Sequence, residues 1–117
     1  MKKIVIDGVE YAPVGAKAEN AAGLPYVIVR CYAAGVHAGY LKRRDDVNKV
    51  VDLVSARRLW QWHGRTLSGL AVEGTDDPSL CRFGDPLDIV LAEWCEIMPC
   101  TEAARDSLES VKEWKND

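Results

Sequence analysis

The stretch that decides the fold is residues 55–65, SARRLWQWHGR, near the middle of the chain. It contains two of the four tryptophans and three arginines. Because side chains alternate between the two faces of a β-strand, this stretch predicts two sets of residues. One set is Arg58, Trp60 and Trp62, and the other is Arg57, Leu59 and Gln61. Two indole rings beside a guanidinium can stack a base and pair a phosphate. The competing interpretation is that the tryptophans belong to the core and that arginine stems cover them.

The overall composition is that of a globular protein with one modest core. The chain has 117 residues, of which 48% are hydrophobic and 28% are charged. Its formal net charge is −3 and its isoelectric point is near 5.4. A general DNA or RNA binder usually carries a strong basic excess, so we expect no nucleic-acid partner. A small anionic ligand remains compatible, because a few local arginines are enough to bind it.

No segment predicts export, membrane insertion or a metal site. The apolar run after Lys3 is too short for a signal peptide, and no stretch approaches the ~18 apolar residues of a membrane helix. The four cysteines form no Cys-x-x-Cys pair, and the histidines are not suitably spaced beside them. We therefore expect no metal, no cofactor and no membrane partner. The expected location is the cytoplasm, with reduced thiols that fill small apolar spaces.

The N-terminal part predicts a β-hairpin that is separate from the core. Residues 2–14 contain two short β-branched or aromatic runs around Asp7-Gly8, a strong signal for a two-residue turn. Residues 15–23 are small and polar, and predict a mobile loop or a short helical turn. We thus expect a single domain over residues 1–117, with the hairpin in residues 1–14 and the core in residues 25–117.

Residues 26–32 show the clearest strand pattern. One face carries Val27, Val29 and Cys31, which we expect to be core. The other face places Arg30 among aromatic residues, so it is similar to the arginine–tryptophan surface described above.

The next stretch contains two glycines and a histidine. Gly35 and Gly39 permit close backbone approach, either to a neighbouring strand or to a ligand. His37 is a structural hydrogen-bond donor or a site residue, and the first role is the commoner one for a lone histidine in a strand. Residues 47–54 then predict a strand that continues into the tryptophan-rich stretch, with a bend or bulge at Ser55. Either two strands or one long bent strand fits this pattern.

Two helix starts and one more strand complete the pattern. Thr66 is a suitable N-cap for a short helix that Gly74 ends, and the helix start beside Arg65 could hold an anion. Residues 87–98 predict a strand of uncertain register, with a bulge near Glu93 as one explanation. Thr101 is a suitable N-cap for a second helix.

The predicted fold class is therefore α+β. We expect a mainly antiparallel sheet of roughly five to seven strands, an N-terminal hairpin and two short helices.

Four segments together resemble a group of small proteins encoded by phages and prophages. They are RCYAAGVHAG at residues 30–39, SARRLWQWHG at residues 55–64, LSGLA at residues 67–71 and EIMPCTE at residues 96–102. This group resembles the first family of Thoeris anti-defence proteins. The resemblance implies a sponge that binds cyclic ADP-ribose isomers made by host TIR enzymes and does not cleave them. It also implies a homo-oligomer in the host cytoplasm, with pockets at or near subunit contacts and, in some members, a second site for cyclic oligonucleotides.

Such a ligand suggests a role for each candidate residue. Adenine calls for an aromatic stack, which Trp60 or Trp62 can supply. The pyrophosphate calls for arginine forks from Arg57 or Arg58, and Arg30 and Arg65 are further candidates. His37 or Gln61 can bond ribose hydroxyls, while Gly35 and Gly39 admit close approach. No catalytic residue is required.

Two other classes of function remain open at this point. The residues His37, His63, Glu93 and Glu96 could be assembled into an acid–base scheme for a nucleotide-hydrolysing enzyme, although no spacing demands it. A protein-binding inhibitor is the third possibility, because exposed aromatic residues and an acidic tail suit such a role.

Overall fold

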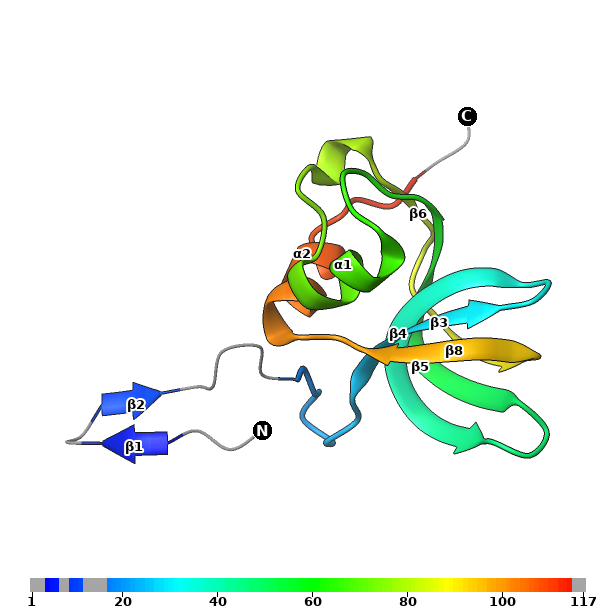
Figure 1. Ribbon diagram of the computed structural model, residues 1–117, viewed down its shortest axis with the longest axis horizontal. Helices are drawn as coiled ribbons and strands as arrows, with labels where there is room; N and C mark the ends of the chain where they lie inside the picture. Colours follow the sequence, from blue (N-terminus) through cyan, green and yellow to red (C-terminus); the bar gives the residue numbers. More distant parts are fainter. Residues whose placement is uncertain (1–3, 7–8, 12–16, 115–117) are drawn as a thin grey trace.

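The computed structural model describes residues 4–6, 9–11 and 17–114, and it has an α+β fold built on an antiparallel sheet (Figure 1). This confirms the predicted fold class. The strands are β1 (Ile4–Ile6), β2 (Val9–Tyr11), β3 (Tyr26–Cys31), β4 (Gly35–Asp45), β5 (Val50–Gln61), β6 (Arg82–Phe83), β7 (Leu87–Ala92) and β8 (Trp94–Pro99). The helices are α1 (Leu67–Glu73), the short 3-10 helix η1 (Pro78–Leu80) and α2 (Glu102–Glu109).

The hairpin of β1 and β2 forms a two-stranded sheet of its own, with Ile6 opposite Val9. This confirms the predicted pairing of these strands. The predicted turn at Asp7-Gly8 and the outer ends of the hairpin lie outside the described residues.

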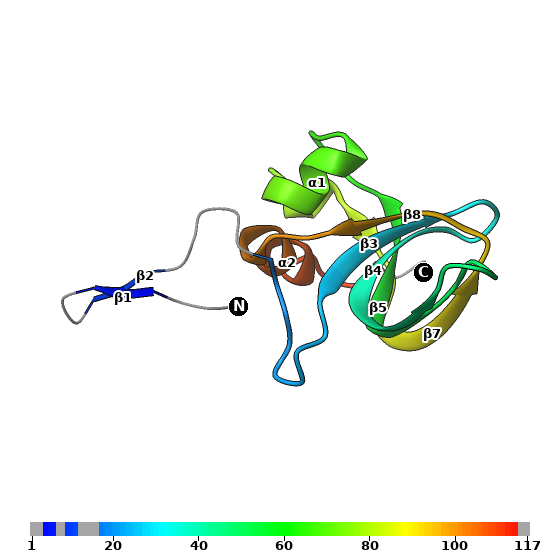
Figure 2. The ribbon, with the colours of Figure 1, turned by 60° about the horizontal axis from the view of Figure 1, so that its bottom comes forward.

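The main sheet has six strands in the order β6-β5-β4-β3-β8, with β7 also paired to β5. The prediction of one strand over residues 87–98 is wrong, because the chain turns at Glu93, whose φ is 58°. β7 pairs with β5, whereas β8 crosses to pair with β3 at the other side of the sheet. β7 and β8 are joined directly at Glu93 but pair with strands on opposite sides of β4, so the sheet must curl to bring them together. Figure 2 shows β7 and β8 on either side of this curl.

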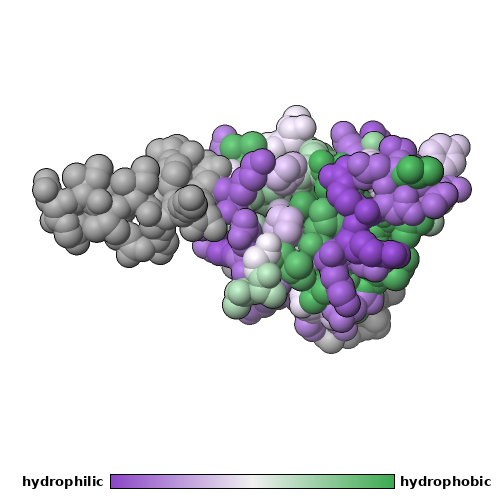
Figure 3. Space-filling model, turned by 90° about the horizontal axis from the view of Figure 1, so that it is seen from below, coloured by the Kyte–Doolittle hydropathy of each residue, from purple (hydrophilic) through white to green (hydrophobic). Residues whose placement is uncertain are grey.

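The curled sheet has a core on each face, which we call the inner core and the outer core. The inner core lies on the concave face and consists of Val27, Val29, Cys31, Val51, Leu53, Ala56, Leu91 and Trp94. The outer core lies under α1 and α2 and includes Tyr26, Ile28, Ala38, Leu59, Leu70, Phe83, Ala104 and Leu108. β3 is therefore buried on both faces along most of its length. On the side of the body seen in Figure 3, apolar surface is visible between charged side chains.

β5 is one long strand, the second of the two alternatives left open by the sequence, and it bends at Ser55 as predicted. Ser55 has a φ of 51°, and the pairing of β5 with β7 shifts register between Leu53 and Ala56. Gly39 on β4 lies against this bend. A Cβ built on Gly39 would come within 2.7 Å of the Ala56 Cα, so the close approach at Gly39 is to a neighbouring strand.

Both predicted helix starts are confirmed. The Thr66 hydroxyl accepts a hydrogen bond from the Gly69 amide at 3.1 Å, and Gly74 ends α1 with a φ of 78°. The Thr101 hydroxyl accepts from the Ala104 amide at 3.1 Å and donates to the Val72 carbonyl at 2.6 Å. Thr101 therefore both begins α2 and ties it to α1.

The segment expected to be a mobile loop or a short helical turn is anchored to the body at Ala18, while most of its other described residues are exposed. Ala18 is 0% exposed and belongs to the outer core. Its amide donates to the Cys100 carbonyl, and its own carbonyl accepts from the Tyr26 amide, both at 3.0 Å. The small side chain of Ala18 allows this point of the segment to pack closely beside the end of β8.

The four cysteines are free thiols. Cys31, Cys81 and Cys100 are buried, as the prediction of apolar filling requires, whereas Cys95 is exposed. Burial raises the pKa of the Cys100 thiol to about 12 and also raises the pKa of Cys31. Among the described residues, no helix combines the length and apolarity needed to cross a bilayer.

Candidate functional site

A pocket of about 260 Å³ opens on the inner face at the end of β5, and we call it the Trp60 pocket. Three of the predicted site residues, His37, Arg58 and Trp60, line it. Its other walls come from Ala56, Gly84, Asp85, Leu87 and Ile89. The bend at Ser55 sets the alternation of side chains, so Ala56, Arg58 and Trp60 face the same side of β5.

Arg58 and Trp60 form a stacked pair at this pocket. The guanidinium carbon of Arg58 lies 5.2 Å from the centroid of the indole ring. Trp60 is 57% exposed, although it is one of the largest apolar side chains in the chain. The pair therefore presents a flat ring and a positive charge together at a partly open surface.

His37 lies at the back of the Trp60 pocket and has a structural partner. It is 1% exposed, and its Nε2 donates to the Ala34 carbonyl at 2.9 Å. Burial lowers the pKa of His37 by more than the hydrogen bond to Ala34 raises it, and the charge of Arg58 lowers it further. The neutral imidazole is therefore the favoured form at neutral pH, with Nε2–H committed to the backbone.

Arg57, next to Arg58 in the sequence, points to the opposite face. It is 5% exposed, and its Nε donates to the Gly84 carbonyl at 2.9 Å. Its Nη1 donates to the Leu108 carbonyl at 3.2 Å, near the C-terminal end of α2. Its guanidinium also lies 5.3 Å from the Phe83 ring centroid. Arg57 therefore joins the helix layer to the sheet, and burial lowers its pKa.

The structure does not bring the remaining predicted site residues to the Trp60 pocket. Trp62 lies beyond the end of β5 and packs against the outer core, so it does not share a surface with Arg58 and Trp60 as the strand pattern predicted. Gln61 donates to the Leu80 carbonyl at 3.3 Å. Arg30 pairs with Glu96 at 2.7 Å. It shares a face of β3 with Tyr26 and Ile28, which belong to the outer core, so it does not face the Trp60 pocket.

Arg65 and the two glycines are also accounted for by other contacts. Arg65 pairs with Glu73 at 2.6 Å. Gly35 has a φ of 82° and begins β4, where a Cβ would meet nothing within 4 Å. Gly39 allows the backbone of β5 to approach closely at Ala56, as described above. Each of these residues thus has a structural explanation that does not involve the Trp60 pocket.

Sequence reasoning missed the residues that close the pocket from the far side. Asp85, Leu87 and Ile89 come from the β6–β7 loop and from β7, about thirty residues after Arg58. No local pattern marks them, because their position depends on the pairing of β7 with β5.

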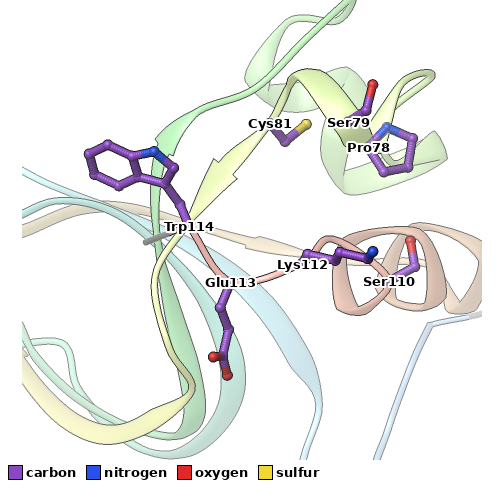
Figure 4. Close-up of a pocket in the computed structure, with 7 residues that line it drawn as sticks. All are labelled: Pro78, Ser79, Cys81, Ser110, Lys112, Glu113 and Trp114. Atoms are coloured by element: carbon purple, nitrogen blue, oxygen red, sulfur yellow. The ribbon is translucent and has the colours of Figure 1, made fainter. Parts of the chain in front are cut away.

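A second and larger cavity lies between η1 and the segment that follows α2 (Figure 4), and we call it the Trp114 pocket. Its volume is about 550 Å³. It is lined by Pro78, Ser79, Cys81, Ser110, Lys112, Glu113 and Trp114.

Comparisons with known proteins assign the family. No curated protein matches the chain, and no solved structure matches it. The family described as a domain of unknown function, DUF6948, matches residues 24–108. The matched range includes every residue that lines the Trp60 pocket, but it stops before Ser110 and the C-terminal wall of the Trp114 pocket. The chain therefore belongs to the DUF6948 family.

Proposed function

We propose that this chain binds a cyclic ADP-ribose isomer at the Trp60 pocket and holds it without cleavage. It would thus act as a phage-type anti-defence protein that sequesters a cyclic nucleotide immune signal. The observation that carries the proposal is the stacked pair of Arg58 and Trp60 beside a pocket. The resemblance to Thoeris anti-defence proteins supplies the identity of the ligand.

The groups in the pocket match the parts of such a ligand. The exposed ring of Trp60 can stack adenine, an interaction worth about 1–3 kcal/mol per base. The Arg58 guanidinium can form charge-assisted hydrogen bonds to a phosphate. Asp85 supplies a carboxylate that can accept hydrogen bonds from ribose hydroxyls.

The size of the pocket limits how much of the ligand it can enclose. Its volume of about 260 Å³ lies below the usual range of roughly 300–1,000 Å³ for ligand pockets. We therefore expect the base and one ribose to enter the Trp60 pocket, while the remaining part of the ligand lies over the exposed surface of Trp60.

Binding without cleavage fits the state of His37. A histidine that serves as general acid or base needs a nitrogen free to exchange a proton with the substrate. The Nε2 of His37 donates to the Ala34 carbonyl, and the residue is only 1% exposed, so little of the ring is open to a substrate. This supports a structural role for the one histidine that lines the pocket.

The test is isothermal titration calorimetry with cyclic ADP-ribose and its isomers, followed by recovery of the ligand. After denaturation of the protein, chromatography should return the ligand intact. Trp60→Ala and Arg58→Ala should each weaken binding by about fivefold or more, since stacking and charged hydrogen bonds contribute at least ~1 kcal/mol.

A matched control exists in the same chain. Arg82 and Trp114 form another arginine–tryptophan pair, with 5.4 Å between the guanidinium carbon and the ring centroid. Arg82→Ala and Trp114→Leu should therefore leave the nucleotide affinity unchanged. Equal losses at both pairs would mean that the Trp60 pocket is not the site.

Two outcomes would support the other classes of function. Recovery of a cleaved product would favour a nucleotide-hydrolysing enzyme. If no nucleotide binds, a protein-binding inhibitor becomes the better explanation, and the exposed apolar residues Trp60, Leu87 and Val90 on β5 and β7 would be its first candidate contacts.

A further inference from the structure

The Trp114 pocket has a well-supported wall near the C-terminal end of the described chain. The Trp114 amide donates to the Phe83 carbonyl at 2.8 Å, and Glu113 forms a parallel bridge with Phe83. Arg82 lies over the indole ring of Trp114. These contacts hold the segment after α2 beside β6, so the opening between this segment and η1 is part of the folded structure.

The cavity is apolar on several sides. Trp114, Pro78 and the Cys81 side chain supply the apolar walls, and Figure 4 shows them around the opening. The Cys81 thiol lines the pocket, and its proton is donated to the Thr75 hydroxyl at 3.3 Å. A volume of about 550 Å³ is within the usual range of roughly 300–1,000 Å³ for small-molecule pockets.

In Figure 4 the Ser110 hydroxyl is directed toward η1, whereas the Ser79 hydroxyl points away from Ser110 and Lys112. Ser79 donates its proton to Asp77 Oδ1 at 2.5 Å, and Ser110 donates its proton to the Ser107 carbonyl at 2.6 Å. A hydroxyl has one donor and two acceptor lone pairs, so the Ser110 oxygen can still accept a hydrogen bond from a ligand N–H.

One positive charge is directed along the cavity. In Figure 4 the Lys112 side chain extends toward Ser110, below η1, whereas the Glu113 side chain points away from η1. An anionic group on a ligand can therefore reach the Lys112 ammonium without meeting the Glu113 carboxylate first.

We propose that the Trp114 pocket binds a small heteroaromatic carboxylate. The planar ring packs against the apolar walls, the carboxylate pairs with Lys112, and a ring N–H donates to Ser110. This site is distinct from the Trp60 pocket, since the two pockets share no lining residue.

The experiment is a titration of the full chain with indole-3-acetate, followed by ligand-detected NMR. Three related probes separate the contributions: 1-naphthylacetate lacks the ring N–H, indole lacks the carboxylate, and tryptamine carries a positive charge. Indole-3-acetate should bind most tightly, and tryptamine should bind most weakly. Tryptamine binding as tightly as indole-3-acetate would overturn the proposal, and so would the absence of saturable binding by all four probes.

Two variants assign the contacts. Lys112→Met should weaken the binding of indole-3-acetate by about tenfold and leave the binding of indole unchanged, because only the carboxylate pairs with the Lys112 charge. Ser110→Leu should reduce the binding of all probes by filling the cavity. Lys42→Met, at an exposed position on β4, is the matched control and should change nothing. Lys112→Met with unchanged affinity for indole-3-acetate would refute the charge contact.

The result is independent of the proposed nucleotide site. Trp60→Ala should not affect indole-3-acetate, and Lys112→Met should not affect the binding of cyclic ADP-ribose isomers. Loss of indole-3-acetate binding in Trp60→Ala would place the probe at the other pocket and overturn this inference alone.

Discussion

Arg57 and Arg58 are adjacent in the sequence, but they lie on opposite faces of β5 and have different surroundings. Arg57 is buried against Phe83 and donates to two backbone carbonyls, whereas Arg58 stacks on an exposed indole at the edge of a pocket. The strand pattern places the two arginines on opposite faces, but nothing in the local sequence shows which of these faces is covered. The comparison shows that the layer which covers each face of a strand decides whether an arginine is structural or available to a ligand.

The difference arises from what lies beside the middle of β5. On the outer face, α2 ends above Arg57 and leaves the Leu108 carbonyl for it to bond. Along the edge of β5 that does not pair with β4, β7 pairs only as far as Ala56, and β6 begins its pairing at Leu59. Residues 84–86 pass between these strands, and the gap that remains beside Arg58 is the Trp60 pocket.

The largest effect that tests this comparison should come from Arg57→Ala. The substitution leaves the half-buried Gly84 carbonyl without the Arg57 donor and removes one of the donors to the Leu108 carbonyl, which keeps the Val111 amide at 3.3 Å. It also opens a space beside Phe83. We expect a loss of about 3 kcal/mol in the free energy of unfolding, measured by urea denaturation. If Arg57→Ala unfolds no more easily than Arg58→Ala, the distinction between the two faces is wrong.

Gly39→Ala should have the next largest effect. The added methyl would come within 2.7 Å of the Ala56 backbone and push β4 away from the bend in β5. The expected loss is about 2 kcal/mol in the free energy of unfolding. Gly35→Ala is a useful comparison, because open space surrounds that position and only its positive φ opposes the change. A smaller loss at Gly39 than at Gly35 would contradict the proposed crowding.

Tyr40→Phe tests a single contact between the sheet and the helix layer on the outer face. The Tyr40 hydroxyl donates to Glu109 Oε1 at 2.7 Å, and its removal should cost about 1 kcal/mol at neutral pH. The control is Tyr32→Phe, since Tyr32 is 85% exposed and its hydroxyl lies outside both cores. Similar losses in both variants would argue against a specific role for the Tyr40–Glu109 bond.

The same tyrosine should make stability depend on pH at the alkaline end. Burial, followed by the hydrogen bond to Glu109, raises the pKa of Tyr40 from 10.0 to about 12. Between pH 10 and pH 12 the unfolded chain loses this proton while the folded protein keeps it, so the free energy of unfolding must fall as pH rises. Tyr40→Phe should show a shallower decline over this interval in urea melts. An unchanged slope would mean that other groups cause the alkaline loss.

The smallest expected effect on stability is that of Arg58→Ala. Its side chain stacks at the surface, so its removal should change the free energy of unfolding by no more than about 0.5 kcal/mol. Its effect on nucleotide affinity should be much larger, as proposed above. A strongly destabilised Arg58→Ala protein would show that this arginine also holds the fold together.

Local rules predicted much of the fold. The N-caps Thr66 and Thr101, the helix end at Gly74 and the bend at Ser55 each follow from a residue and its immediate neighbours. At Glu93 the sequence indicates a bulge within one strand and not the end of a strand, because the pairing of β7 with β5 and of β8 with β3 depends on strands far apart in the chain. Trp62 was assigned to the wrong surface, since alternation holds only while the strand continues and β5 ends at Gln61.

The sequence by itself determined the elements, the helix caps and the alternation that separates Arg57 from Arg58. These depend on backbone geometry and on contacts within a few residues, which the order of amino acids specifies directly. The tertiary structure decided which face is covered, where the sheet curls and which distant residues, such as Asp85 and Leu87, complete the pocket. Those outcomes depend on pairing between strands far apart in the chain, and no local pattern contains that information.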